Sequence, residues 1–432
     1  MSPTDGIDRT TRTAASSVPE PGSDAPVLSV LIPCWNAAQT IGRALSSVLV
    51  EREIRLECIV VDDGSTDGTA DIVQAIADRD PRVVLVRLPT NAGVSNARNR
   101  GLEVMRGEWF VGLDADDRIM PGGLAALLRP TARPGVLAVI GQRVWTDGER
   151  RWISPVYDNP DIRLPGRKSI ATHPGLLYYV ATVGKLLHRS LLTGLEFQGR
   201  VLGDQPWTVR ALLRAGNDIE VIEDTVYEWW RPHPDHYVAT ITSAKQASAG
   251  RAVEMVRVAT SAFAEVSAEV DDLYPDGTTR DAIKRAYLGR LARSDLGAPV
   301  RSAIDRHDPD TTRLYAEVAR FLGSVPPAIL ASSELLVSSV LRPPAARWRE
   351  LPGAARAAYW AMLRPVLRAD PRSGYRLLFL PRFLPTFPAA IVVRSLETRV
   401  GQSVASVGLW VASTLWALGV ALGRCIPSRH GR

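Results

Sequence analysis

The sequence predicts an α/β fold, namely a doubly wound, mostly parallel sheet followed by an α-helical C-terminal region. Short apolar runs alternate with amphipathic stretches between residues 27 and 113, which is typical of parallel strands joined by right-handed helical crossovers. Two clusters of acidic residues each follow one of these runs directly. After about residue 243 strand patterns end, and apolar residues recur with helical spacing.

The elements of the first part follow from short apolar runs bounded by turn-forming residues, a pattern typical of buried strands. We expect strands at residues 27–33, 57–61, 83–88 and 108–113. Amphipathic stretches between them predict two helices that follow turns at residues 36–40 and 64–69, and a third helix at residues 97–105. Three strand–helix units and a fourth strand therefore open the fold.

The pattern is looser after residue 117. We expect a strand at residues 136–144, a loop at 145–175, short helices at 186–192 and 206–213, and a strand at 219–222. From residue 246 to residue 399 the spacing of apolar residues predicts helices alone, separated by loops at pairs of prolines.

Acidic side chains gather at the ends of two predicted strands. Asp62 and Asp63 follow the second strand, and Asp114, Asp116 and Asp117 follow the fourth. The carboxyl ends of parallel strands meet at one edge of an open sheet, where such sheets place their ligands. Carboxylates that gather without matching cations repel one another unless a divalent cation neutralises them. The pattern therefore predicts an Mg²⁺ or Mn²⁺ site that holds a phosphorylated ligand.

Length and composition indicate a folded chain of two domains. With 432 residues, 46% hydrophobic and 23% charged, the chain is too long for one ordinary core. We expect a disordered tail at residues 1–26, an α/β domain at 27–245, a helical region at 246–399, and an apolar helix with a basic tail at 400–432. Three cysteines without paired spacing and an N-terminus without an apolar signal segment favour a reducing, cytoplasmic location.

Positive charge is concentrated at the C-terminal end. Residues 341–432 contain 14 Arg, no Lys and three acidic residues, a net charge of +11, whereas the whole chain carries +6. Residues 400–423 contain no charged residue and are long enough to span a bilayer. Basic residues interleaved with apolar runs fit an anionic membrane surface better than nucleic acid. We expect the protein at the inner face of the cell membrane. For residues 400–423, three alternatives stay open: a spanning helix, an in-plane or re-entrant helix, and a buried core helix.

Four motifs occur in order, at residues 29–33 with Asn36, 61–67, 91–101 and 107–117. Together they resemble family 2 glycosyltransferases, inverting enzymes of the GT-A fold that use nucleoside-diphosphate sugars. The resemblance covers roughly residues 27–240, and nothing after residue 245 contributes to it. It implies a GT-A, Rossmann-like sheet in the first part of the chain.

The resemblance places a nucleotide site on the first three motifs. Asp63 would accept a hydrogen bond from the base, for example from uracil N3–H; a helix N-cap is the alternative. Pro33 and Asn36 would shape the loop that lines the nucleoside pocket. Arg98 would contact the nucleotide or its diphosphate, for which a guanidinium group is suited; a surface ion pair is the alternative.

The fourth motif resembles the DxD motif of the family. Asp116 would be the main metal ligand, Asp114 would contact the ribose or the sugar, and Asp117 would support the metal directly or through water. A divalent ion stabilises the charge that grows on a leaving diphosphate, and Mg²⁺ needs only one or two carboxylates besides phosphate oxygens. A solvated acidic turn is the structural alternative.

Three later residues extend the resemblance. Asp204 stands where the family carries the catalytic base that takes the proton of the acceptor hydroxyl, and it is also a candidate N-cap of the next helix. Many relatives have Glu where this chain has Gly203. Arg231 would clamp the diphosphate, and Lys185 would be structural or lie on the acceptor side.

These observations predict a hexosyltransferase-type enzyme that moves a sugar, with inversion and with a divalent metal, from a UDP-linked donor to an acceptor hydroxyl. The expected setting is cell-envelope or exopolysaccharide synthesis, with a glycan or lipid-linked acceptor and no nucleic acid. A nucleotidyltransferase would need a Gly-rich basic loop where this chain has residues 33–36. A non-catalytic nucleotide-binding scaffold is the alternative of a different class, and it would not need to keep Asp63 or Asp204.

Overall fold

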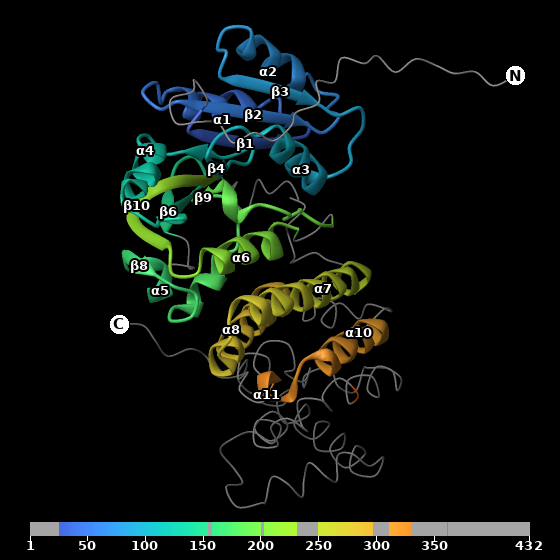
Figure 1. Ribbon diagram of the computed structural model, residues 1–432. Helices are drawn as coiled ribbons and strands as arrows, with labels where there is room; N and C mark the ends of the chain where they lie inside the picture. The colour runs from blue at the N-terminus through green and yellow to red at the C-terminus, as the bar shows by residue number, and fades with distance from the viewer. Residues whose placement is uncertain are drawn as a thin grey trace, which may run out of the picture.

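A computed structural model describes residues 26–153, 158–199, 203–230, 249–296, 311–330 and 361. A sheet of ten strands lies at the centre of its first part (Figure 1). The strands are β1 (Leu28–Cys34), β2 (Leu56–Asp62), β3 (Val83–Arg87), β4 (Trp109–Gly112), β5 (Arg118–Ile119), β6 (Ala138–Thr146), β7 (Arg151–Ile153), β8 (Gly166–Lys168), β9 (Lys185–His188) and β10 (Ile219–Trp230).

The strand order is β3-β2-β1-β4-β9-β6-β10-β5, with β7 paired to β6 and β8 paired to β10. The first four strands form a parallel unit, with β2 and β4 on either side of β1. Strand β9 runs antiparallel to both β4 and β6, whereas β6 and β10 are parallel. Strands β1 and β2 are buried along their whole length, which fits sequences that are apolar except for Ser29, Glu57 and Asp62. The Ser29 hydroxyl donates to the Glu57 carboxylate at 2.6 Å.

Helices cover both faces of the sheet and form a separate group beyond α6 (Figure 1). The α-helices are α1 (Ile41–Leu49), α2 (Thr69–Ala77), α3 (Val94–Val104), α4 (Gly123–Leu128), α5 (Pro160–Arg163), α6 (Asp204–Ala215), α7 (Ala249–Leu273), α8 (Gly277–Arg290), α10 (Thr311–Ser324) and α11 (Pro327–Leu330). Helix α8 continues into a π-helical turn, η7 (Leu291–Leu296), and the 3-10 turns are η1 (Arg129–Ala132), η3 (Pro174–Tyr178) and η4 (Arg189–Leu191).

Alternate side chains of β1 enter two hydrophobic clusters, one on each side of the sheet. Val30 and Ile32 pack with α1 in one cluster. Leu31 belongs to the other, which continues through Trp207 of α6 to Tyr287 of α8 and reaches α10. The helices after residue 249 therefore share a core with the sheet and are not merely attached to it.

The predicted fold class is confirmed, but three predicted elements differ from the structure. Residues 185–188 form strand β9 where we expected a helix, because pairing with β4 and β6 buries both sides of this segment; only the 3-10 turn η4 follows. Residues 145–175, expected as a loop, contain β7, α5 and β8. Strand β10 also continues eight residues beyond the predicted end at Ile222, past the polar pair Glu223 and Asp224.

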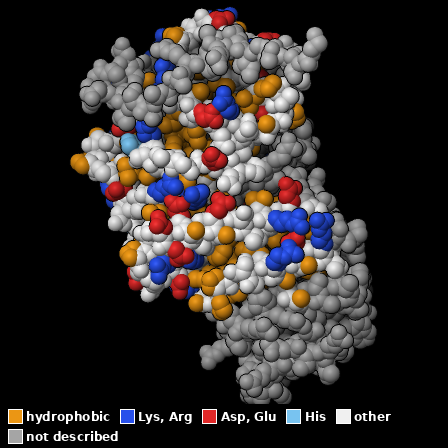
Figure 2. Space-filling view, turned by 45° about the vertical axis from the view of Figure 1, so that its right-hand side comes forward, with side chains coloured by type: hydrophobic (Ala, Val, Ile, Leu, Met, Phe, Trp, Pro, Cys, Tyr) orange, Lys and Arg blue, Asp and Glu red, His pale blue; other side chains and the backbone are white. Residues whose placement is uncertain are grey.

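On the face shown in Figure 2, Lys and Arg side chains lie next to Asp and Glu side chains across the described surface. No helix within the described residues is both long and apolar enough to cross a membrane. The basic segment and the uncharged stretch at residues 400–423 lie outside the described residues, apart from Ala361. The predicted membrane segment therefore stays a prediction.

Candidate functional site

The two acidic clusters lie at the same edge of the sheet, on either side of β1. Cys34, the last residue of β1, is the register partner of Asp62 on β2. On the other side, Leu31 pairs with Gly112 at the end of β4, just before the second cluster. The strand register therefore brings the two clusters to the same edge of the sheet, as the sequence predicts.

The Asp63 side chain holds the loop that leads into α3. It is 3% exposed, and its two carboxylate oxygens accept the backbone N–H groups of Ala92 at 2.9 Å and Gly93 at 2.7 Å. Asp63 does not cap the helix that follows it, because the cap position of α2 is Gly68. A carboxylate oxygen has a second lone pair, so both oxygens of Asp63 can still accept another hydrogen bond.

The loop after β1 folds over the Asp63 region. Asn36 adopts a left-handed backbone conformation with φ 50°, its N–H donates to Ser65 Oγ at 2.9 Å, and its Oδ1 accepts from the Thr66 N–H at 2.9 Å. Pro33 is buried inside β1. The same loop leaves Trp35, which the sequence interpretation missed, 50% exposed beside this site.

Arg98 joins α3 to the second acidic cluster. Its guanidinium group donates to Asp114 Oδ1 at 3.0 Å and lies 5.5 Å from the ring centre of Phe197. The Arg98 side chain is 11% exposed and that of Asp114 is 37% exposed. The ion pair expected as an alternative therefore exists, but it lies within the site and points a cation at the acidic cluster.

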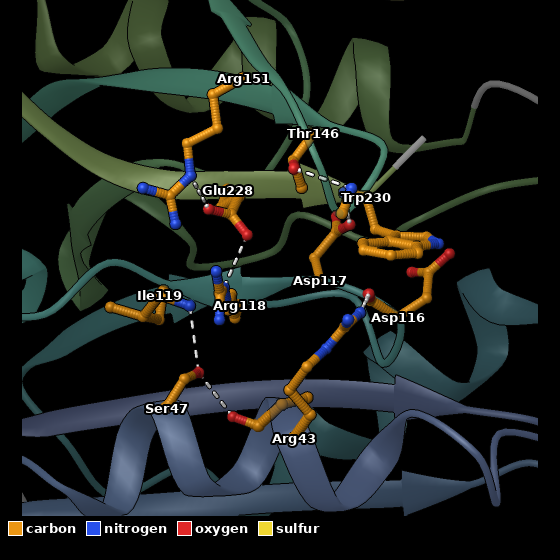
Figure 3. Close-up of polar contacts among 12 residues, drawn as sticks. Arg43, Ser47, Asp116, Asp117, Arg118, Ile119, Thr146, Arg151, Glu228 and Trp230 are labelled. Carbon is orange, nitrogen blue, oxygen red and sulfur yellow. Dashed lines mark hydrogen bonds and ion pairs between the residues drawn. The ribbon is translucent and has the colours of Figure 1, made fainter. Parts of the chain in front are cut away.

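Asp116 is the exposed carboxylate of the cluster. Desolvation by the surrounding protein, and next the charge of Asp114, raise the pKa of Asp116 to about 6. Its backbone carbonyl accepts from Arg43 at 2.6 Å, and the Arg43 guanidinium lies 4.6 Å from the ring centre of Trp230. Figure 3 shows the Asp116 carboxylate beside the Trp230 ring, with Arg43 approaching from α1.

Asp117 fastens the acidic cluster to β10. It is 1% exposed, and its Oδ2 accepts the Tyr227 hydroxyl at 2.6 Å. Its Oδ1 accepts the Trp230 backbone N–H at 2.7 Å (Figure 3). Burial, followed by the charges of Asp116 and Asp114, raises the pKa of Asp117 well above its usual range. These contacts orient the loop whether or not Asp117 also touches a cation.

The donor set fits a hard divalent cation that obtains its other ligands from elsewhere. Asp116 is exposed, Asp114 is partly exposed, and both offer oxygen atoms. Among the described residues, no group of three or more His, Cys, Asp or Glu side chains forms a complete metal site. Mg²⁺ commonly binds through one or two carboxylates, substrate phosphates and water, so this sparse arrangement suits it.

Asp204 is the first residue of α6 and not its N-cap, which is Gly203; the N-cap alternative is therefore wrong. A Cβ atom on residue 203 would lie 2.2 Å from the backbone oxygen of Gln198 and 2.5 Å from Ser95 Oγ. This close approach excludes the Glu that many relatives have at this position. It also places the start of α6 against the first turn of α3.

Lys185 is fully buried near Asp204. Its Nζ donates to the Ala181 carbonyl at 2.6 Å and lies 3.4 Å from the ring centre of Tyr179. Desolvation, and next the charge of Arg143, hold the pKa of Lys185 well below its usual range, whereas Asp204 opposes the shift. Arg231 lies outside the described residues, so its proposed contact with the diphosphate stays a prediction.

The strand order and the helices that cover the sheet define an α/β protein of the GT-A fold class. Residues 29–194 match the family described as Glycosyl transferase family 2, and this part of the chain belongs to that family. The solved structure of TarS residues 1–349 from S. aureus, in complex with UDP-GlcNAc, has the same fold. It shares 20% identity and a TM-score of 0.59 over 83% of this chain and 94% of that chain.

Curated relatives match the N-terminal part of the chain. The succinoglycan biosynthesis protein ExoO of Rhizobium meliloti is 40% identical over 103 residues, covering 24% of this chain and 29% of the relative. The putative teichuronic acid biosynthesis glycosyltransferase TuaG of Bacillus subtilis is 42% identical over 93 residues, covering 22% of this chain and 37% of the relative. The chain therefore matches well under half of the length of these relatives.

Arg43 and Tyr227, like Trp35, were absent from the sequence-based site. Arg43 lies on α1, a helix that was predicted only from its apolar residues. Tyr227 lies in the part of β10 that was not predicted as a strand. Trp35 did have a signal, since it stands between Pro33 and Asn36 in the first motif. An exposed aromatic side chain such as that of Trp35 can stack on a planar ligand.

Proposed function

We propose that this protein is an inverting, metal-dependent glycosyltransferase that moves a hexosyl-type sugar from a UDP-linked donor to an acceptor hydroxyl. The observation that carries the proposal is the convergence of Asp63, Arg98 and Asp116 at one edge of the sheet, from three separate motifs. Family membership of residues 29–194 supports the reaction class.

The nucleoside would lie between the loop after β1 and Asp63. In this proposal a spare lone pair of Asp63 accepts the N3–H of uracil, and Trp35 stacks on the base. A buried acceptor selects strongly for a ligand that can donate to it, because an unpaired buried group is costly. Pro33 and Asn36 hold the loop in place through the contacts to Ser65 and Thr66.

The diphosphate would meet Arg98 and the acidic cluster. Asp116, supported by Asp114, would hold Mg²⁺ or Mn²⁺, which supplies Lewis-acid stabilisation of the charge on the leaving diphosphate. Arg98 would exchange part of its ion pair with Asp114 for a phosphate oxygen, and Arg231, which lies outside the described residues, would add a second cation. Asp117 keeps the loop oriented through Tyr227 and Trp230.

Asp204 is the proposed catalytic base. Inversion at the anomeric carbon requires one displacement, in which the acceptor oxygen attacks as its proton passes to a carboxylate. Asp204 starts α6 against the first turn of α3, and α3 also carries Arg98, so one helix relates the base to the diphosphate site. Lys185 lies near this carboxylate, since the charge of Asp204 opposes the lowering of the Lys185 pKa.

For the acceptor, we propose a cell-envelope or exopolysaccharide glycan, free or linked to lipid, at the inner face of the cell membrane. The relatives named for succinoglycan and teichuronic acid biosynthesis support this setting. The basic residues 341–432 would hold the protein at an anionic surface. Deletion of residues 341–432 should abolish sedimentation with anionic vesicles; a full-length protein that stays in the supernatant would contradict the membrane proposal.

The donor site is tested by calorimetric titration of UDP, GDP, CDP and dTDP in the presence of Mn²⁺. The wild type should bind UDP with a dependence on metal, and Asp116→Asn should lose that dependence. Asp271→Asn, a substitution of an exposed acid on α7, is the matched control and should bind like the wild type. Absence of nucleotide binding under all conditions would favour the non-catalytic scaffold.

A further inference from the structure

The buried side chains of Arg290 and Asp295 form a closed network with the half-buried Gln205 at the start of α6. Gln205 Nε2 donates to Asp295 Oδ1 at 3.2 Å, and Arg290 Nη1 donates to Gln205 Oε1 at 2.5 Å. Arg290 also pairs with both oxygens of Asp295, at 2.6 Å and 3.3 Å. Arg290 and Asp295 are each 3% exposed. Each of the three side chains therefore bonds to the other two, and the Arg290 Nε is the one buried polar atom of the network without a partner among the described residues.

The network adjoins the proposed base. Gln205 follows Asp204 directly in the first turn of α6. Three charged groups act on this place from the packed elements: Lys185 on β9, Arg290 on α8 and Asp295 on η7. On the other side, the backbone at Gly203 is pressed against Gln198 and Ser95. The start of α6 is thus held from two sides, and one of them belongs to the helices after residue 249.

The π-helical turn explains how Asp295 reaches α6. A π-helix is rare and shifts the side chains that follow it relative to a regular α-helix, and such turns are often found at functional sites. Here η7 begins directly after Arg290, so the wider turn brings Asp295 back onto the Arg290 guanidinium. A buried ion pair adds little net stability, but several hydrogen bonds between the same two side chains, as here between Arg290 and Asp295, restrict their relative geometry.

A second polar cluster further along α6 serves as a comparison. Glu269 of α7 accepts from Arg210 at 2.9 Å and from Arg214 at 2.6 Å. This cluster also fastens α6 to the helical region, and its carboxylate is 13% exposed. Unlike the network around Gln205, the Glu269 cluster does not contact the first turn of α6.

We propose that Gln205, Arg290 and Asp295 are positioning residues that set the orientation of Asp204, so that the helical region beyond the family match completes the active site. This inference rests on the proposed role of Asp204 as the base. Figure 1 shows α6 lying between the sheet and α7 and α8, as this arrangement requires. A displacement of about 1 Å at a reacting group can lower a rate on the order of a hundredfold.

The test uses the full-length protein and compares Gln205→Met with Glu269→Gln. Gln205→Met removes the link to α6 and leaves the Arg290–Asp295 pair intact, so the variant should fold; Asp295→Asn is a second, harsher variant. Three quantities are measured: hydrogen exchange of the amides of residues 207–209, the Kd for UDP with Mn²⁺, and the rate of UDP release from UDP-Glc, UDP-GlcNAc, UDP-Gal and UDP-GalNAc. Asp204→Asn is the reference for loss of the base.

Gln205→Met should speed exchange at residues 207–209 and lower UDP release at least about tenfold with an unchanged Kd for UDP, whereas Glu269→Gln should change neither exchange nor release. Exchange and release equal to the wild type in Gln205→Met would overturn the inference. Should Asp204→Asn release UDP as fast as the wild type, the proposed base is wrong, and hydrogen exchange alone then decides whether the network orders α6. If none of the four donors is hydrolysed, hydrogen exchange alone decides whether the network orders the start of α6.

Discussion

The Tyr227 hydroxyl donates to Asp117 Oδ2 at 2.6 Å, and both side chains are buried. The same hydroxyl accepts from the Asp114 backbone N–H at 3.3 Å. One phenol therefore links the acidic loop after β4 to β10, the strand that ends at Trp230 beside Asp116. This link holds the loop that carries Asp116, the proposed metal ligand.

Replacement of Tyr227 by Phe should destabilise the protein by about 1–3 kcal/mol, because it leaves a buried carboxylate with one donor fewer. Thermal unfolding measures this loss. Tyr287→Phe is the matched control: the Tyr287 hydroxyl is buried without a hydrogen-bond partner among the described residues, so its removal should be neutral or stabilising. Equal losses in the two variants would contradict the linking role of Tyr227.

The acidic cluster should make stability without metal depend on pH in an unusual direction. The pKa of Asp116 is raised to about 6, from 3.8 in the unfolded chain, so the folded protein binds the extra proton in this interval. The destabilising contribution is full above pH 6 and disappears as the pH falls toward 4. The shift of Asp117 has the same direction.

Asp116→Asn removes that contribution. The Tm of the wild type in the absence of divalent cations, relative to the Tm of Asp116→Asn, should therefore rise as the pH is lowered from 7 to 5. Scanning calorimetry of the two proteins in parallel provides the measurement. A difference in Tm that stays constant over this range would show that Asp116 titrates normally.

The sequence was sufficient for the features that depend on local patterns. Continuous apolar runs predict buried parallel strands, and the acidic residues after them had to meet at one edge. The misassigned segment at residues 186–192 shows the limit, because Leu186, Leu187, Leu191 and Leu192 have a spacing that suits a helix as well as a strand. Pairing with two neighbours that are distant in sequence decided in favour of the strand.

The contacts that orient the site were beyond prediction for a related reason. Tyr227 lies 110 residues from Asp117, and Gln205 lies 90 residues from Asp295. No spacing rule connects positions so far apart, and each side chain taken alone is an ordinary member of a strand or helix. The same holds for Gly203, whose conformation is regular and whose necessity appears only when Gln198 and Ser95 are in place.

Gly203→Ala should therefore destabilise the protein by about 1–3 kcal/mol, because an added Cβ meets backbone that cannot yield without moving α6. Gly323→Ala on α10 is the control, since nothing lies within 4 Å of its Cβ position. A helical Gly replaced by Ala without a clash gains up to about 1 kcal/mol. Chemical denaturation of both variants gives the comparison, and a stabilised Gly203→Ala would refute the close approach.

The buried Lys185 should make stability rise with pH on the alkaline side. Its pKa in the folded protein is held well below 10.5, so between that lowered value and 10.5 the unfolded chain binds the proton that the folded protein has released. Raising the pH through this interval removes the cost of burying the ammonium group.

The variant Lys185→Met keeps a side chain of similar size that cannot titrate. The free energy of unfolding of the wild type, relative to Lys185→Met, should increase from pH 7 to pH 10 in urea titrations. If the two free energies of unfolding instead depend on pH in the same way, Asp204 and the Ala181 carbonyl keep the pKa of Lys185 at its usual value.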